Sequence, residues 1–364
     1  MSKPVSYYEQ KNMDYTTKLR EVLAELPAFC RDFFRAMEPK TQPKTRISYA
    51  YDLRIFFNFL IEKNPVFKDY TLADFKLSDL DKLQAVDIEE YEEYLKLYDA
   101  SGDKIITNTE KGLARKMSSL RSFYNYYFKH LMIRTNPPMQ VAMPKLHQKA
   151  IIRLDVDEVA ELLDYIENCG ESLSGQKKVY YEKTKYRDLA LITLLLGTGI
   201  RVSECVGLDM NDVDFKNNSI KVTRKGGNQM YVYFGNEVEN ALYDYLNQTR
   251  LHTTPLPGYE NALFLSMQRK RISVRSVEEL VHKYSMQVTP NKHITPHKFR
   301  STYGTNLYRE TGDIYLVADV LGHKDVNTTK KHYADMGDDR RRMAASAVIL
   351  REKREVKVTL EDNI

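Results

Sequence analysis

The stretch YRDLALITLLLGTGIRVSE, residues 186–204, decides the fold of the C-terminal half of the chain. Residues 186–196 are apolar around most of a helical circumference, which is typical of a helix buried in a large core. The Gly-Thr-Gly turn that follows ends this helix, and we expect a second helix to begin near Arg201. Glu204 lies three residues later on the same helical face, where its carboxylate can hold the Arg201 guanidinium.

Downstream, a lysine is predicted on a β-hairpin. Residues 219–223 and 230–234 are β-branched and aromatic, and a Gly-Gly-Asn turn at residues 226–228 separates them. This pattern predicts two antiparallel strands. Lys225 then lies where the first strand enters the turn.

Three more polar residues follow in positions that core packing does not explain. The segment ITPHKFR ends at Arg300 and places His297 one turn earlier on the same face of a predicted helix. The segment LGH ends a further helix at His323, and Tyr333 follows ten residues later.

Together, these residue types suit phosphodiester transfer. The transition state carries extra negative charge on its non-bridging oxygens, and planar, permanently protonated arginines match that geometry. A tyrosine hydroxyl can attack phosphorus and form a phosphotyrosine, while a lysine on a turn can give a proton to the departing 5′ oxygen. The sequence has no G-x-x-x-x-G-K-[ST] loop and no H-E-x-x-H pair. We therefore expect neither a cofactor nor a metal.

The order of these motifs resembles that of the tyrosine recombinases of the phage-integrase and Xer type. GTGIRVSE resembles the family's first-arginine motif, TRKGG its hairpin lysine, TPHKFR its H-x-x-R box and LGH its second histidine. The resemblance implies that Glu204 supports Arg201 and that Tyr333 is the nucleophile. The implied catalytic residues are Arg201, Lys225, His297, Arg300, His323 and Tyr333.

The resemblance also implies the fold, a mainly α-helical protein with a small β-hairpin or sheet in its catalytic domain, arranged as a two-domain C-shaped clamp. Helical periodicity runs from about residue 15 to 133, including Leu19–Phe34, and a proline-rich segment follows it. The expected divisions are a helical, SAM-like core-binding domain (1–135), a linker (136–152), a catalytic domain (153–340) and a tail (341–364), which either packs on its own subunit or docks on a neighbouring one.

Charge is unevenly distributed and suggests where DNA binds. The formal net charge of +5 conceals a contrast, because residues 71–100 hold nine acidic and three basic residues, whereas residues 101–150 hold two acidic and nine basic ones. The second segment can face a polyanion. The candidate DNA contacts are Lys44, Arg46, Lys111, Arg115, Lys116 and Arg121 in the first domain, and Arg224, Arg269 and Arg271 in the second.

Several function classes are disfavoured by the sequence. The three cysteines, Cys30, Cys169 and Cys205, are far apart, so we expect reduced thiols rather than disulfides or a zinc cluster. No apolar stretch is long enough to span a bilayer, and the N-terminus lacks the apolar core of a signal peptide. We expect a soluble, cytoplasmic, nucleoid-associated protein with no membrane partner.

The resemblance implies a site-specific recombinase that acts on double-stranded DNA sites through a 3′-phosphotyrosyl intermediate, as a homotetramer on paired sites. Resolution of chromosome dimers is the favoured role, because the residues before the first helices look too few for an arm-binding domain. Integration or excision of a mobile element is the alternative; a type IB topoisomerase and a catalytically idle DNA-binding relative are less favoured. A second recombinase or a motor protein could act as partner or activator.

Overall fold

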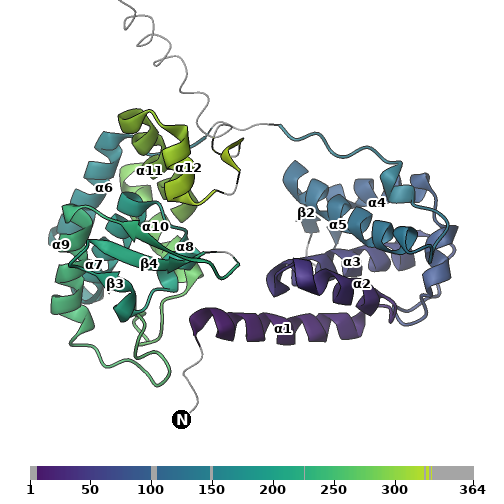
Figure 1. Ribbon diagram of the computed structural model, residues 1–364, viewed down its shortest axis with the longest axis horizontal. Coiled ribbons are helices and arrows are strands. Elements are labelled where there is room, and N and C mark those ends of the chain that lie inside the picture. The colour runs from purple at the N-terminus through teal and green to yellow at the C-terminus, as the bar shows by residue number, and fades with distance from the viewer. Residues whose placement is uncertain are drawn as a thin grey trace, which may run out of the picture. The chain divides into compact units, whose positions relative to one another are not determined.

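The computed structural model describes residues 6–99, 105–147, 151–224, 226–323, 325–327 and 329. The chain folds into two compact units, residues 1–149 and 150–364. Both units consist mostly of helices, and the described residues of each form one small antiparallel sheet (Figure 1). The predicted fold class, mainly α with a small sheet in the second half, is confirmed.

The helices of the first unit are α1 (Tyr7–Glu25), α2 (Cys30–Met37), α3 (Pro43–Lys63), α4 (Ala85–Lys96) and α5 (Glu110–Lys129). Short 3₁₀ segments lie at Glu38–Lys40, Leu77–Lys82 and Pro137–Met139. The prediction of continuous helix over Leu19–Phe34 is wrong, because α1 ends at Glu25 and Leu26 is extended, with a ψ of 158°. Pro27 follows Leu26, and a residue before proline avoids the helical conformation.

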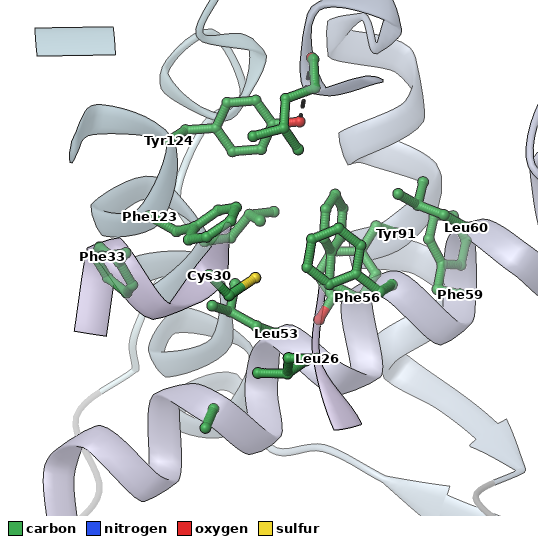
Figure 2. Close-up of a cluster of buried hydrophobic side chains, with 14 of the residues drawn as sticks. Leu26, Cys30, Phe33, Leu53, Phe56, Phe59, Leu60, Tyr91, Phe123 and Tyr124 are labelled. Atoms are coloured by element: carbon green, nitrogen blue, oxygen red, sulfur yellow. Dashed lines mark hydrogen bonds between the residues drawn. The ribbon is translucent and has the colours of Figure 1, made fainter. Parts of the chain in front are cut away.

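An aromatic core joins these helices. Phe33, Phe56, Phe123, Tyr91 and Tyr124 are almost fully buried, and Figure 2 shows them facing one another from α2, α3, α4 and α5. The rings of Phe33 and Phe123 are perpendicular with centroids 5.3 Å apart, and those of Phe56 and Tyr91 are 5.0 Å apart. Edge-to-face packing of this kind adds about 0.5–1.5 kcal/mol per pair to the burial energy.

The first unit also contains a small sheet, in a region where the sequence predicts only helix. Strand β1 (Leu97–Asp99) pairs with β2 (Ile105–Thr107), with Tyr98 opposite Ile106. Three-residue strands are too short to show a two-residue periodicity, which explains why the pattern missed them.

The beginning of the predicted linker packs against the first unit. Pro137, Pro138 and Val141 are buried, and Val141 belongs to the aromatic core. The Arg121 guanidinium donates to the carbonyl oxygens of Pro138, at 2.8 Å, and of Val141. Residues 136–141 are thus held by α5.

The second unit surrounds one long helix, α7 (Gly175–Thr198), which packs against α6, α9 and α11. The other helices are α6 (Val156–Asn168), α8 (Val202–Val206), α9 (Asn236–Tyr245), α10 (Val274–Val288), α11 (Pro296–Thr311) and α12 (Ile314–Leu321), with 3₁₀ turns at Cys169–Ser172 and Met210–Asp212 and a π turn at Leu246–Arg250. The predicted buried helix 186–196 is the C-terminal half of α7. Among the described residues, no helix is long and apolar enough to cross a membrane.

The predicted hairpin is confirmed, and a third strand pairs with it to form a small sheet. Strands β3 (Val213–Asp214), β4 (Ser219–Thr223) and β5 (Gln229–Tyr233) form an antiparallel sheet in that order. Gly226 and Gly227 lie between β4 and β5 with φ values of 101° and 88°, which residues with a side chain rarely adopt.

Candidate functional site

The turn after α7 brings three segments together. Gly199 has a φ of 62°, and its N–H donates to the Leu195 carbonyl at 3.1 Å. A methyl group on Gly199 would overlap the Tyr303 ring of α11 and lie 3.0 Å from Leu321 Cδ2 of α12. Glycine at this position therefore allows the end of α7 to approach α11 and α12, which carry the H-x-x-R box and the LGH segment. These two helices lie side by side (Figure 1).

Arg201 directly precedes α8 and is held by Glu204. The Arg201 backbone N–H donates to one Glu204 carboxylate oxygen at 2.9 Å, and Nη1 donates to the other at 2.8 Å. The Glu204 side chain is 3% exposed, whereas that of Arg201 is 36% exposed. The predicted contact is therefore present, and it fixes a guanidinium that remains accessible to a ligand.

Glu204→Gln is expected to slow strand cleavage about tenfold. The amide keeps the shape of the side chain, but it removes the charge that strengthens the hydrogen bonds to Arg201, each worth about 1.5–3 kcal/mol when charged. Single-turnover cleavage of a DNA site would measure this. Glu279→Gln, which alters an exposed carboxylate paired with Arg275 on α10, is the matched control; equal rates for both variants would contradict a supporting role for Glu204.

Arg300 ties the Gly199 turn to the end of α12. Its side chain lies in α11, and the residue is 4% exposed. Nη1 donates to the Gly199 carbonyl at 2.7 Å, and Nη2 donates to the Leu321 carbonyl. One guanidinium thus joins the segment before Arg201 to the segment before His323.

His323 follows the left-handed residue Gly322, which has a φ of 62°. The His323 backbone N–H donates to the Ala318 carbonyl at 2.9 Å. The ring nitrogen Nδ1 lies 2.7 Å from Oγ1 of the fully buried Thr329. This hydrogen bond orients the half-buried ring.

His297 and Arg300 lie one turn apart on α11, as the sequence predicts. Pro296 occupies the first turn of the helix, and His297 is exposed while Arg300 is buried. Among the predicted catalytic residues, the structure brings Arg201, Arg300 and His323 together, because Arg300 bonds to the residue two positions before each of the other two. Lys225 and Tyr333 lie outside the described residues, as does the tail 341–364.

Arg224 also belongs to this site, although the sequence predicts it only as a DNA contact. It is 9% exposed and donates to two carbonyls of α12. Burial lowers the pKa of Arg224, with Glu204 opposing this change and Arg201 adding to it. Arg224 and Arg300 both donate to the Leu321 carbonyl, which places Arg224 at this site. Its position directly before Lys225 is the sequence signal that points to the site.

Tyr303 is the described tyrosine nearest to this turn. Burial raises its pKa, which disfavours the phenolate form. Within α8, burial likewise raises the pKa of the Cys205 thiol, so this cysteine is inert. Within the described part of the chain, no group of three or more His, Cys, Asp or Glu residues is arranged to hold a metal ion.

Several predicted DNA contacts of the first unit have partners within the protein. Arg115 forms a two-pronged ion pair with the buried Asp52, with one distance of 2.8 Å. The Lys116 ammonium, 2.7 Å from Asn108 Oδ1, is buried, which lowers its pKa. Arg46 is 6% exposed and lies 2.9 Å from Glu38. Arg121, as described above, holds residues 136–141.

The remaining candidates differ in exposure. Arg271 in the second unit donates to the Val206 and Leu208 carbonyls, at 3.0 and 2.7 Å, and pairs with Asp209. In contrast, the side chains of three candidates are at exposed positions: Lys44, Lys111 and Arg269.

Known proteins resemble this chain in both sequence and fold. The model of the phage integrase family matches residues 152–340. A tyrosine recombinase XerC from Caldanaerobacter subterraneus subsp. tengcongensis is 33% identical over 323 residues, which cover 86% of this chain and 84% of that protein. A tyrosine recombinase XerS from Streptococcus uberis is 31% identical over 348 residues, covering 89% and 96% of the two chains.

Solved structures share the fold at low sequence identity. The integrase of transposon Tn1549 in complex with transposon right-end DNA aligns with a TM-score of 0.64 and 19% identity, over 88% of this chain and 99% of that one. The XerH site-specific recombinase in its post-cleavage complex with a palindromic difH substrate aligns with a TM-score of 0.60 and 18% identity, over 84% and 80%.

Proposed function

The chain belongs to the phage integrase family as a site-specific tyrosine recombinase of the Xer type, and we propose which role each catalytic residue has in cutting and rejoining a DNA strand. The observation that carries the proposal is the pair of hydrogen bonds that Arg300 donates to the carbonyls of Gly199 and Leu321. It joins the segments that carry Arg201 and His323 into one rigid site.

In the proposed reaction, the Tyr333 hydroxyl oxygen attacks the scissile phosphorus. The P–O bond to the tyrosine forms as the bond to the 5′ oxygen breaks, which leaves a 3′-phosphotyrosine and a free 5′ hydroxyl. His297 accepts the tyrosine proton, and Lys225 donates a proton to the departing oxygen. Arg201, Arg300 and His323 stabilise the charge on the non-bridging oxygens. Attack by a second 5′ hydroxyl reverses these steps and rejoins the strand.

We further propose that the first unit is the helical core-binding domain and that the second unit carries catalysis. Exposed cations are best suited to hold phosphates, because they need not give up a protein partner. Of the predicted contacts, Lys44 and Lys111 in the first unit and Arg269 in the second are exposed; Arg115 is exposed too, but it is paired with Asp52.

The biological role that we favour is chromosome dimer resolution, at a site on the nucleoid. The test is to recover the bound DNA site from genomic fragments and then to place two copies of it on a supercoiled plasmid. We expect recombination by the purified protein in the presence of a chelator and without a nucleotide. Relaxation of plasmids that lack the site would instead indicate a topoisomerase, and recovered sites at the ends of a mobile element would replace dimer resolution with integration. Recombination only after a second recombinase or a motor protein is added would identify a required partner.

Deleting residues 341–364 is expected to abolish synapsis of paired sites while single-site binding stays within about twofold of the full chain. The reason is that the proposed active form is a homotetramer in which this segment docks on a neighbouring subunit. Gel-shift and cross-linking measurements on one-site and two-site DNA would separate the two steps. Unchanged recombination by the truncated protein would rule out this role.

A further inference from the structure

Arg224 fastens the base of the β4–β5 turn to the end of α12. Its guanidinium donates to the Val320 carbonyl through Nη2 at 2.9 Å and to the Leu321 carbonyl through Nη1. Its Nε lies 2.9 Å from the sulfur of Met230 in β5. Three donors of a buried side chain are thus engaged within the protein.

These bonds complete the hydrogen bonding at the C-terminus of α12. The last four carbonyls of a helix lack partners within it. Here the backbone N–H groups of Gly322 and His323 satisfy those of Ala318 and Asp319. The remaining two carbonyls, of Val320 and Leu321, accept from Arg224, and Leu321 also accepts from Arg300. The negative end of the helix dipole favours two cations at this place.

The backbone of Arg224 is also hydrogen-bonded within the hairpin turn. Its N–H donates to the Asn228 carbonyl at 2.7 Å, and its carbonyl accepts from Gly227 at 3.0 Å. The guanidinium also lies against Gly322, since a methyl group there would come within 2.6 Å of its Cζ atom. Arg224, the residue directly before Lys225, therefore contacts Gly322, the residue directly before His323.

We propose that Arg224 is a positioning residue for strand cleavage, which holds the hairpin turn on α12 so that Lys225 can protonate the departing 5′ oxygen. This proposal rests on the function proposed above for Lys225. It differs from direct phosphate binding, because burial and three internal partners already occupy the guanidinium. General acid catalysis contributes about 10²- to 10⁴-fold, and a displacement of about 1 Å can cost about 10²-fold.

The test compares two nicked DNA substrates, one with the normal 5′ oxygen and one with sulfur at that position. A thiolate has a conjugate-acid pKa of about 8.5 and leaves without a proton donor. Arg224→Met, which keeps an unbranched chain but loses all donors, should cleave the oxygen substrate about 10²-fold more slowly and the sulfur substrate at nearly the wild-type rate. Arg224→Lys, which can keep one hydrogen bond, should lose about tenfold with oxygen only.

Two control variants test the positioning role of Arg224 separately from the general-acid role of Lys225. Arg250→Met removes a guanidinium that is 5% exposed and donates to the Ala262 and Glu260 carbonyls, at 2.9 and 2.6 Å, rather than to α12. It should affect both substrates equally. Lys225→Ala should show the same rescue by sulfur as Arg224→Met.

Equal losses on both substrates in both Arg224 variants, or no loss in either, would overturn the positioning role. If the equal loss came with a shallower salt dependence of DNA binding, Arg224 would be a phosphate contact instead. If Lys225→Ala were not rescued by sulfur, the failure would belong to the proposed general acid and not to Arg224.

Discussion

Tyr333→Phe is expected to lower the rate of strand cleavage by at least about 10⁴-fold, because loss of a nucleophile typically removes most of the enzymatic acceleration. The phenylalanine ring keeps the shape of the side chain and removes only the hydroxyl oxygen that forms the bond to phosphorus. DNA affinity should change less than threefold. The measurement is single-turnover formation of the covalent adduct on a nicked site, beside a binding titration on the intact site.

Tyr303→Phe is the matched control for that experiment. Tyr303 packs against the Gly199 turn, and burial raises its pKa, so its hydroxyl is a poor nucleophile. This variant should form the adduct at nearly the wild-type rate. Adduct formation that persisted in Tyr333→Phe and disappeared in Tyr303→Phe would reverse the assignment.

Arg300→Lys is expected to slow cleavage by about 10²- to 10³-fold and to reduce the free energy of unfolding by about 1–3 kcal/mol, because the Gly199 carbonyl loses its partner while the Leu321 carbonyl keeps Arg224. A lysine ammonium cannot reproduce the planar fork that reaches both the Gly199 and Leu321 carbonyls. The loss of activity therefore has two sources, a displaced turn before Arg201 and a weaker clamp on the phosphate. Urea unfolding and single-turnover cleavage measure them separately.

Arg250→Lys provides the comparison for Arg300→Lys. It alters another buried guanidinium that bonds two backbone carbonyls, in a part of the second unit that carries no proposed catalytic residue. A similar loss of stability with much less loss of cleavage is expected. If both variants lost activity in proportion to stability, Arg300 would be only a structural residue.

The local features of the site could be predicted from the sequence. The end of α7, the Arg201–Glu204 ion pair, the hairpin and the one-turn spacing of His297 and Arg300 each depend on residues close together in the chain. Helix periodicity, turn glycines and three-residue spacing report directly on such features. The break at Pro27 follows the same local rule and was predictable, although the periodicity on either side suggested a continuous helix.

The contacts between distant segments could not be predicted in this way. Arg224 and Leu321 are 97 positions apart in the chain, and Arg115 and Asp52 are 63 apart. Counting charges along the chain shows where cations are abundant, but not which of them are buried with a partner. In the structure Arg46 and Lys116 are buried and have partners within the first unit, whereas Arg115 is exposed and pairs with Asp52.

The most direct test of the whole account is to map the covalent protein–DNA bond. The chain has 26 tyrosines, and the covalent bond to DNA is expected on one of them. A nicked recombination site would trap the adduct, and mass spectrometry of the digested complex would identify the peptide that carries the 3′ nucleotide. The predicted result is a single modified peptide, with the nucleotide on Tyr333. A nucleotide on any other residue, Tyr303 included, or cleavage of the site without a covalent adduct would contradict the account.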